Sequence, residues 1–211
     1  KRGIQPRAAR GCAVLAVALC GGFLGTAATG AETPLVLALA LGALEAWRCG
    51  RLGWVLAAAV GCALLRVEAW PFALAVMVLL WRRRPGLRPA LAASLLLVPA
   101  AWFLPELAGS GDPLRSGERA RVPNPGQPAL AEVPALASLE ESARLLLWPL
   151  WIGVAALAIE VRRGRVARAA LLPVAAGTAW IALVAVMAEL GFSGEPRYSL
   201  PGAAFVAIGG A

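Results

Sequence analysis

Histidine is absent from this chain of 211 residues, and cysteine is rare. Without histidine the chain lacks the commonest general base and the commonest zinc ligand, which excludes a Ser-His-Asp triad and an HExxH metal site. None of the four cysteines belongs to a CxxC pair, so neither a disulfide framework nor a metal knuckle is indicated. No Walker or Rossmann loop is apparent. We therefore expect no metal and no cofactor.

Charge is also scarce, since only 15% of the residues are charged while 60% are hydrophobic. A soluble domain carries about a quarter charged residues, so this composition indicates an integral membrane protein. The net charge of +8 would suggest a nucleic-acid partner in a soluble protein. Here the basic residues lie in short turns between apolar stretches, where they attract anionic lipid. We expect membrane lipid as a partner and no nucleic acid.

The basic residues form four clusters, and a pair of apolar stretches separates each cluster from the next. The clusters are Lys1, Arg2, Arg7 and Arg10; Arg48 and Arg51; Arg82, Arg83, Arg84 and Arg88; and Arg162, Arg163, Arg165 and Arg168. Basic residues near the ends of spans mark the cytoplasmic side. Ten of the 12 acids fall on the opposite side. The pattern predicts an integral membrane protein whose N-terminus is cytoplasmic.

The expected fold is all-α, a polytopic transmembrane helix bundle with about seven complete spans and one truncated span. The complete spans are expected at 11–29, 33–47, 52–65, 69–81, 89–105, 145–159 and 169–188, and Tyr198 opens the truncated one. Residues 52–81 either cross the bilayer twice or form a re-entrant pair, because both halves are shorter than the roughly 20 residues that a span needs. The first span also resembles a secretory signal peptide.

We expect residues 1–211 to form a single membrane domain with one long extracytoplasmic loop at about 106–144. Five prolines favour extended or turn-like structure in this loop. Near its end, Ser138-Leu139-Glu140-Glu141 fits a capping box that would begin a helix leading into the next span. Because the chain begins with Lys1 and stops at Ala211 inside an apolar run, we expect a fragment of a longer protein.

The polar residues that could carry chemistry all fall on the expected outer side. Glu32 precedes a helix start, where the helix dipole stabilises an acid. Arg66 and Glu68 lie between two apolar helices, and charges at that depth usually face a polar cavity or one another. At a spacing of i, i+2 on one helix they would not face each other. They are either snorkelling ends of a tight turn or the wall of an outward cavity in which Arg66 binds phosphate.

Two further groups complete the candidate substrate-binding residues. Asp112 follows Gly109-Ser110-Gly111 and precedes Pro113, which is also ordinary loop chemistry. Arg197 and Tyr198 lie at the mouth of the last span, where they could equally be interface anchors. Their common side favours a shared site, whose candidate residues are Glu32, Arg66, Glu68, Asp112, Arg197 and Tyr198.

At these residues the chain resembles the GT-C superfamily of membrane glycosyltransferases, which includes protein O-mannosyltransferases. Gly30-x-Glu32-Thr33 and Leu65-Arg66-Val67-Glu68-Ala69-Trp70-Pro71 are similar to the "G-x-E-T … L-x-R-P-E" segment of bacterial members. Gly109-Ser110-Gly111-Asp112-Pro113 and Glu195-Pro196-Arg197-Tyr198-x-x-Pro201 are similar to the later loop and helix entry of actinobacterial relatives. Val67 stands where the family pattern has a proline.

The resemblance implies a cell-envelope enzyme that transfers a sugar from a polyprenyl-phosphate donor to an acceptor hydroxyl on the extracytoplasmic side, with inversion. It implies that Arg66 or Arg197 holds the donor phosphate and that Asp112 or Glu32 positions the sugar. The family's catalytic Asp or Glu lies in a loop that would precede Lys1, so we expect the catalytic acid outside this chain.

Two other readings of the residues stay open. A transporter or flippase for a lipid-linked anion would use the same outward cavity and arginines, with broken helices and repeat symmetry as its signs. In a structural membrane subunit the outer charges would only be solvated.

Overall fold

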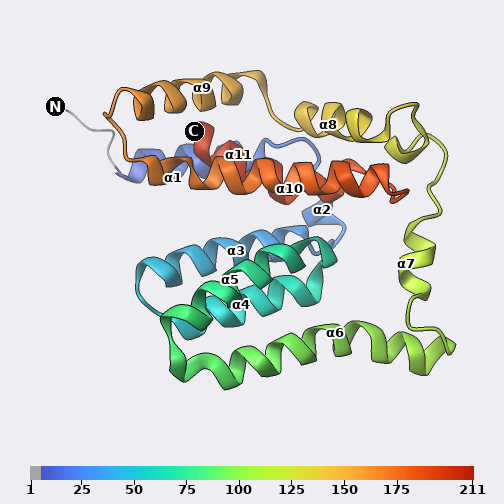
Figure 1. The fold of residues 1–211 in the computed structure, drawn as a ribbon. Helices are drawn as coiled ribbons and strands as arrows, with labels where there is room; N and C mark the ends of the chain where they lie inside the picture. The colour runs from blue at the N-terminus through green and yellow to red at the C-terminus, as the bar shows by residue number, and fades with distance from the viewer. Residues whose placement is uncertain (1–5) are drawn as a thin grey trace. The chain divides into compact units, whose positions relative to one another are not determined.

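The computed structural model describes the backbone from Pro6 to Ala211 and the side chains from Gly11 onward. This part of the chain consists of eleven α-helices and four short 3-10 helices, and it contains no β-strand (Figure 1). The expectation of an all-α fold is confirmed. Of the first basic cluster, Lys1 and Arg2 lie outside the described residues, as do the side chains of Arg7 and Arg10.

The helices divide into two compact units. Unit 1 combines the segment that ends at Pro34 with residues 123–211, and unit 2 is residues 35–122. One boundary, between Val122 and Pro123, falls inside the proline-rich loop expected at about 106–144, whereas the other, between Pro34 and Leu35, falls in an apolar stretch that the sequence does not mark. Each unit is described separately below.

Unit 2 is built from five helices connected by short turns. They are α3 (Thr33–Arg48), which begins at the unit boundary, α4 (Leu52–Leu65), α5 (Trp70–Arg83), α6 (Arg88–Ser110) and the short α7 (Arg115–Ala120). The 3-10 helices η1 (Val67–Ala69) and η2 (Pro85–Leu87) connect α4 to α5 and α5 to α6. Prolines stand in the first turns of α5 and α6, where a missing N–H costs nothing. Two apolar clusters along α4, α5 and α6 form the core of this unit.

Unit 1 is organised around its last helix. Its helices are α1 (Pro6–Ala18), α2 (Phe23–Ala28), α8 (Pro134–Arg144), α9 (Trp148–Arg162), α10 (Leu172–Glu189) and α11 (Pro196–Gly210), and its 3-10 helices are η3 (Pro128–Leu130) and η4 (Arg168–Leu171). Helix α11 is buried continuously over residues 199–207 and contacts α1, α8, α9 and α10. Its apolar side chains pack with residues of α1 and with the α8–α9 connection.

Glycine allows α10 and α11 to approach closely. A Cβ atom built on Gly202 of α11 would lie 2.7 Å from the carbonyl oxygen of Gly177 in α10 and 2.9 Å from Cγ1 of Ile181. Real Cβ atoms essentially never come so close to another heavy atom. The contact between the two helices therefore depends on the absence of a side chain at this crossing.

By length and composition, two helical segments in the described chain can cross a membrane, Pro85–Ser110 and Arg168–Glu189. A third candidate is the pair α8 and α9, if two helices that meet at 95° count as one span. The expectation of about seven complete spans is therefore wrong. Helices α3, α4 and α5 have only 16, 14 and 14 residues. At 1.5 Å per residue they extend about 21–24 Å, less than a hydrocarbon core of about 30 Å.

Several expected boundaries also change. The span expected at 11–29 is broken between α1 and α2, where Gly22 has a left-handed φ of 79° and the Gly21 N–H donates to the Leu145 carbonyl at 2.8 Å. The span expected at 89–105 continues to Ser110, so the long loop is shorter than predicted and contains α7 and α8. The expected capping box at Ser138 is wrong, because α8 begins at Pro134 and Ser138 lies buried within it.

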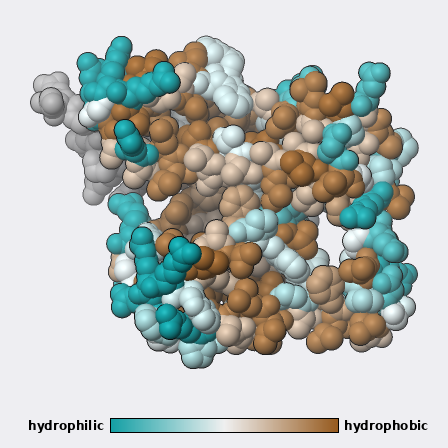
Figure 2. Space-filling view, in the orientation of Figure 1, coloured by the Kyte–Doolittle hydropathy of each residue, from teal (hydrophilic) through white to brown (hydrophobic). Residues whose placement is uncertain are grey.

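Large apolar side chains are exposed along the helices of both units. Trp148, Leu96 and Trp54 are 73%, 74% and 69% exposed. Figure 2 shows the resulting extensive hydrophobic surface, with the hydrophilic side chains concentrated near helix ends and connections. Surfaces of this kind mark contacts with membrane or protein partners.

Replacing Gly202 with alanine tests the close crossing of α10 and α11. The added methyl group must push the helices apart, and we expect a loss of about 1–3 kcal/mol in the free energy of unfolding, measured by denaturant titration in detergent. Gly42→Ala in α3 is the control, because a Cβ there meets nothing within 4 Å. This control should gain about 0.5–1 kcal/mol from helix propensity, and an equal gain at Gly202 would contradict the close crossing.

Candidate functional site

The turn between α4 and α5 buries two opposite charges. Arg66 is 4% exposed and Glu68 is 5% exposed, and Nη1 of Arg66 lies 3.8 Å from Oε1 of Glu68. The i, i+2 argument for one helix does not apply, because the two residues do not share an α-helix. Arg66 has extended backbone angles (φ −143°, ψ 128°), and Glu68 follows within the 3-10 helix η1. This local geometry turns both side chains toward one another.

Two tryptophans hold the same turn by bonding to one backbone carbonyl. The indole N–H groups of Trp70 in α5 and Trp102 in α6 each donate to the Ala63 oxygen of α4 at 3.0 Å. A carbonyl in the last turn of a helix has no partner within the helix, so the two indoles satisfy an acceptor that would otherwise be costly to bury. The rings of Trp70 and Trp102 pack edge to face, with centroids 6.5 Å apart. Three helices are thereby joined next to the buried ion pair.

An apolar groove lies between α5 and α6 and begins at this turn. Its volume is about 360 Å³, and Ala63 and Trp70 contribute to its wall. Leu74, Met77 and Val98 line it further along, and Ser94 is the one polar residue in the lining. A groove of this size and chemistry suits a hydrocarbon chain. Because Ala63 and Trp70 belong to both features, one end of the groove adjoins the Arg66–Glu68 turn.

Arg197 and Tyr198 form a second polar group, in the first turn of α11. Nε of Arg197 pairs with Glu195 at 2.5 Å, and its Nη2 donates to the Tyr198 hydroxyl at 3.1 Å. Glu195 in turn accepts from the Gln127 amide, which ties the start of α11 to the segment before α8. Trp180 of α10 donates to the Tyr198 carbonyl at 2.7 Å. These contacts give Arg197 and Tyr198 a structural role at the entry of α11.

The two remaining candidates, Asp112 and Glu32, lie at helix ends. Asp112 accepts from the Leu114 N–H at 2.9 Å and its own N–H bonds to Ser110, so it forms the turn that ends α6. Glu32 is partly buried and lies immediately before Thr33, the first residue of α3.

Two pairs of the candidate residues are in contact, each pair within one unit. Arg66 and Glu68 meet in unit 2, and Arg197 and Tyr198 meet in unit 1. Sequence reasoning missed Trp102 and Gln127, whose partners are 39 and 68 residues away in the chain. Only the spacing of tryptophans near helix ends could have indicated Trp102. Within the described residues there is no group of three or more His, Cys, Asp or Glu that could hold a metal ion.

The chain was compared with known protein families, curated proteins and solved structures. No protein-family model, no curated protein and no solved structure matches the chain.

The buried ion pair can be tested through stability. Glu68→Gln removes the charge that balances Arg66 in a buried turn, and we expect a loss of about 3–5 kcal/mol in the free energy of unfolding. The double variant Arg66→Met with Glu68→Leu should recover most of this loss, because no buried charge remains. Denaturant titration in detergent, followed by tryptophan fluorescence, measures both.

The control for this test is Glu45→Gln. It breaks the ion pair between Glu45 and Arg48, whose side chains are 67% and 80% exposed, respectively. Exposed pairs contribute about 0–1 kcal/mol, so this variant should unfold almost like the parent protein. Equal losses for Glu45→Gln and Glu68→Gln would contradict a special role for the buried turn.

Proposed function

We propose that this chain is part of a membrane glycosyltransferase similar to the GT-C superfamily. In this proposal the protein is integral to a bacterial plasma membrane, the basic clusters and the N-terminus are cytoplasmic, and the donor is a polyprenyl-phosphate-linked sugar. The short motifs around Glu32, Arg66, Asp112 and Arg197 support it, together with the apolar surfaces and the candidate spans. The observation that carries it is the buried Arg66–Glu68 turn beside an apolar groove.

A lipid phosphate offers two chemically different parts, and the α4–α5 turn contains a counterpart for each. The guanidinium of Arg66 carries a planar fork of donors that matches phosphate oxygens. The groove that begins at Ala63 and Trp70 suits the isoprenoid chain. Glu68 balances the arginine charge when no donor is bound, which lowers the cost of keeping that charge buried.

In the proposed reaction an acceptor hydroxyl oxygen bonds to the anomeric carbon of the sugar. The bond from that carbon to the phosphate oxygen breaks, the lipid phosphate leaves with the electron pair, and a base takes the hydroxyl proton. Arg66 would stabilise the negative charge that develops on the leaving phosphate. No candidate residue is assigned as this base in the proposal. Arg197 is the second candidate for binding the phosphate. Glu32 or Asp112 would position the sugar. Glu68 and Tyr198 belong to the same motifs as Arg66 and Arg197 and complete the candidate substrate-binding residues.

A transporter or flippase for a lipid-linked anion is the second candidate function. One observation favours it, because α8 and α9 are together long and apolar enough to cross a membrane but are bent by 95°. Broken helices of this kind build the substrate sites of many transporters. A flippase would move the lipid phosphate across the membrane without breaking its bond to the sugar.

Binding of a short polyprenyl phosphate to the full-length protein in detergent tests the proposal. Arg66→Ala should weaken this binding about tenfold or more, because the phosphate loses its paired cation, and Arg66→Lys should retain part of it. The control is Arg115→Ala, which removes an exposed arginine from α7 of the same unit. Unchanged affinity in Arg66→Ala, with the fold intact by tryptophan fluorescence, would contradict the phosphate role.

Sugar transfer separates the two candidate functions. The glycosyltransferase predicts release of free polyprenyl phosphate from a radiolabelled polyprenyl-phosphate sugar when an acceptor is present. Movement of the intact donor between leaflets of a vesicle, without release, would favour the flippase.

A further inference from the structure

The two basic turns of unit 2 lie at one end of its helix bundle. The turn between α3 and α4 carries Arg48 and Arg51, and the connection between α5 and α6 carries Arg82, Arg83, Arg84 and Arg88. One apolar cluster joins all four helix ends, since Trp47 and Leu52 pack with Leu80 and Leu91. We call these six arginines the basic end. Figure 2 shows hydrophilic side chains gathered at the connections between these helices.

Three arginines of the basic end are held by neighbouring side chains. The guanidinium of Arg83 lies over the Trp47 ring at 5.1 Å, which links α5 to α3. Arg88 lies over the Trp81 ring at 5.5 Å. Such contacts orient a cation over an aromatic face and leave its charge uncancelled. Of the six arginines, Arg48 alone is paired with an acid among the described residues, namely Glu45 at 3.6 Å.

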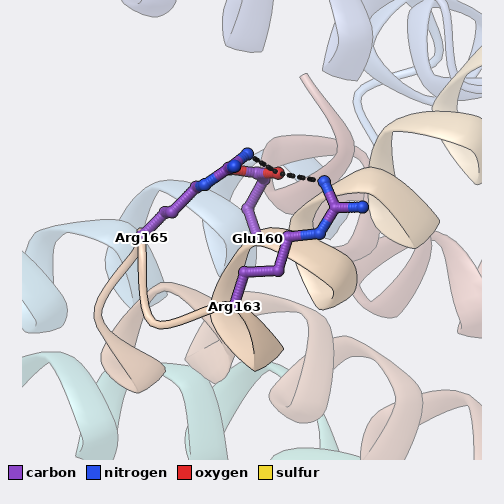
Figure 3. Close-up of polar contacts among 3 residues, drawn as sticks. All are labelled: Glu160, Arg163 and Arg165. Carbon is purple, nitrogen blue, oxygen red and sulfur yellow. Dashed lines mark hydrogen bonds and ion pairs between the residues drawn. The ribbon is translucent and has the colours of Figure 1, made fainter.

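Arg51, Arg82 and Arg84 are exposed, and in the described part of the chain their side chains make no ion pair. The basic turn of unit 1 differs. There, Glu160 of α9 accepts from Arg163 at 3.3 Å and from Arg165 at 3.2 Å, so one acid partly neutralises two arginines (Figure 3). Six arginines and one acid leave the basic end of unit 2 with a net charge of about +5 within a short stretch of surface.

Exposed apolar side chains stand next to this charge. Trp54 in the first turn of α4 is 69% exposed, and Trp81 and Leu79 near the end of α5 are 42% and 38% exposed. Tryptophan beside arginine at a helix end is the arrangement found at the boundary between hydrocarbon and headgroups. A nucleic acid would place phosphates against the arginines and leave the apolar side chains in water. An anionic lipid layer offers phosphates to the arginines and an apolar environment to the tryptophan and leucine side chains.

We propose that the basic end of unit 2 binds the phosphate headgroups of anionic phospholipid. Arg51, Arg82 and Arg84 contact the phosphates, while Trp54 and Trp81 lie at the level of the glycerol backbone. Arg83 and Arg88, oriented by Trp47 and Trp81, add charge to the same surface. The inference requires that unit 2 contacts a membrane, and it is independent of sugar transfer.

The test measures retention of individual lipids by the purified full chain in detergent, using native mass spectrometry. The probes are dioleoylphosphatidylglycerol and dioleoylphosphatidylcholine. We expect the anionic lipid to bind at least tenfold more tightly. Arg82→Gln with Arg84→Gln should weaken its binding about 30-fold, because each arginine near a membrane surface contributes roughly fivefold. Lysine at both positions should retain most of the affinity, since the charge is kept.

The matched control is Arg163→Gln with Arg165→Gln, which removes the same charge from a turn where Glu160 already pairs with both arginines. We expect its effect on phosphatidylglycerol binding to stay within about threefold, since each pair is partly neutralised. Equal binding of the two lipids, an equal loss in the control, or displacement of phosphatidylglycerol by a short RNA would each overturn the inference. The variants are compared only where their unfolding transitions match that of the parent protein. If the parent protein shows the lipid preference but no sugar transfer, the proposed function alone is contradicted.

Discussion

The cost of burying charge governs the centre of unit 2. Arg66 and Glu68 are almost fully buried, and each lowers the cost of burying the charge of the other. They meet across an extended residue followed by a 3-10 turn, between the end of α4 at Leu65 and the start of α5 at Trp70. The indoles of Trp70 and Trp102 then satisfy the Ala63 carbonyl at the end of α4 and connect α6 to the same turn. The groove between α5 and α6 is a consequence of this arrangement.

The packing of unit 1 depends on small side chains at a helix crossing rather than on buried charges. Helix α11 is surrounded by four other helices, and its crossing with α10 is possible because Gly177 and Gly202 have no side chains. The polar groups that this packing buries are matched locally, since the Ser142 hydroxyl lies 2.7 Å from that of Ser199. Close packing of small residues with a few internal hydrogen bonds is also how helices associate in membranes, where no water drives them together. The two units thus use different means to stabilise helices of similar composition.

Both units expose apolar side chains along their helices and place most of their basic residues at helix ends. The basic turn of unit 1 and the basic end of unit 2 differ in one respect that composition does not show. Glu160 pairs with Arg163 and Arg165 in unit 1, whereas the basic end of unit 2 orients two of its arginines on tryptophan rings and pairs one with Glu45. Charge count alone treats these turns as equivalent. Their capacity to attract anions differs because a nearby carboxylate cancels part of the field.

The sequence by itself determined the all-α class and much of the helix placement, since apolar stretches interrupted by arginine, glycine and proline can form little else. The helices expected at 33–47 and 52–65 are observed as Thr33–Arg48 and Leu52–Leu65. Of the candidate site, the sequence indicated Arg66 and Glu68 but not their pairing, which depends on the backbone angles of Arg66. Only the tertiary structure decided the break at Gly21, the burial of Ser138 and the contact of Trp102 with Ala63, because the partners lie on distant segments. The number of candidate spans also fell, because helices of 14 to 16 residues such as α3, α4 and α5 are too short to cross a hydrocarbon core of about 30 Å.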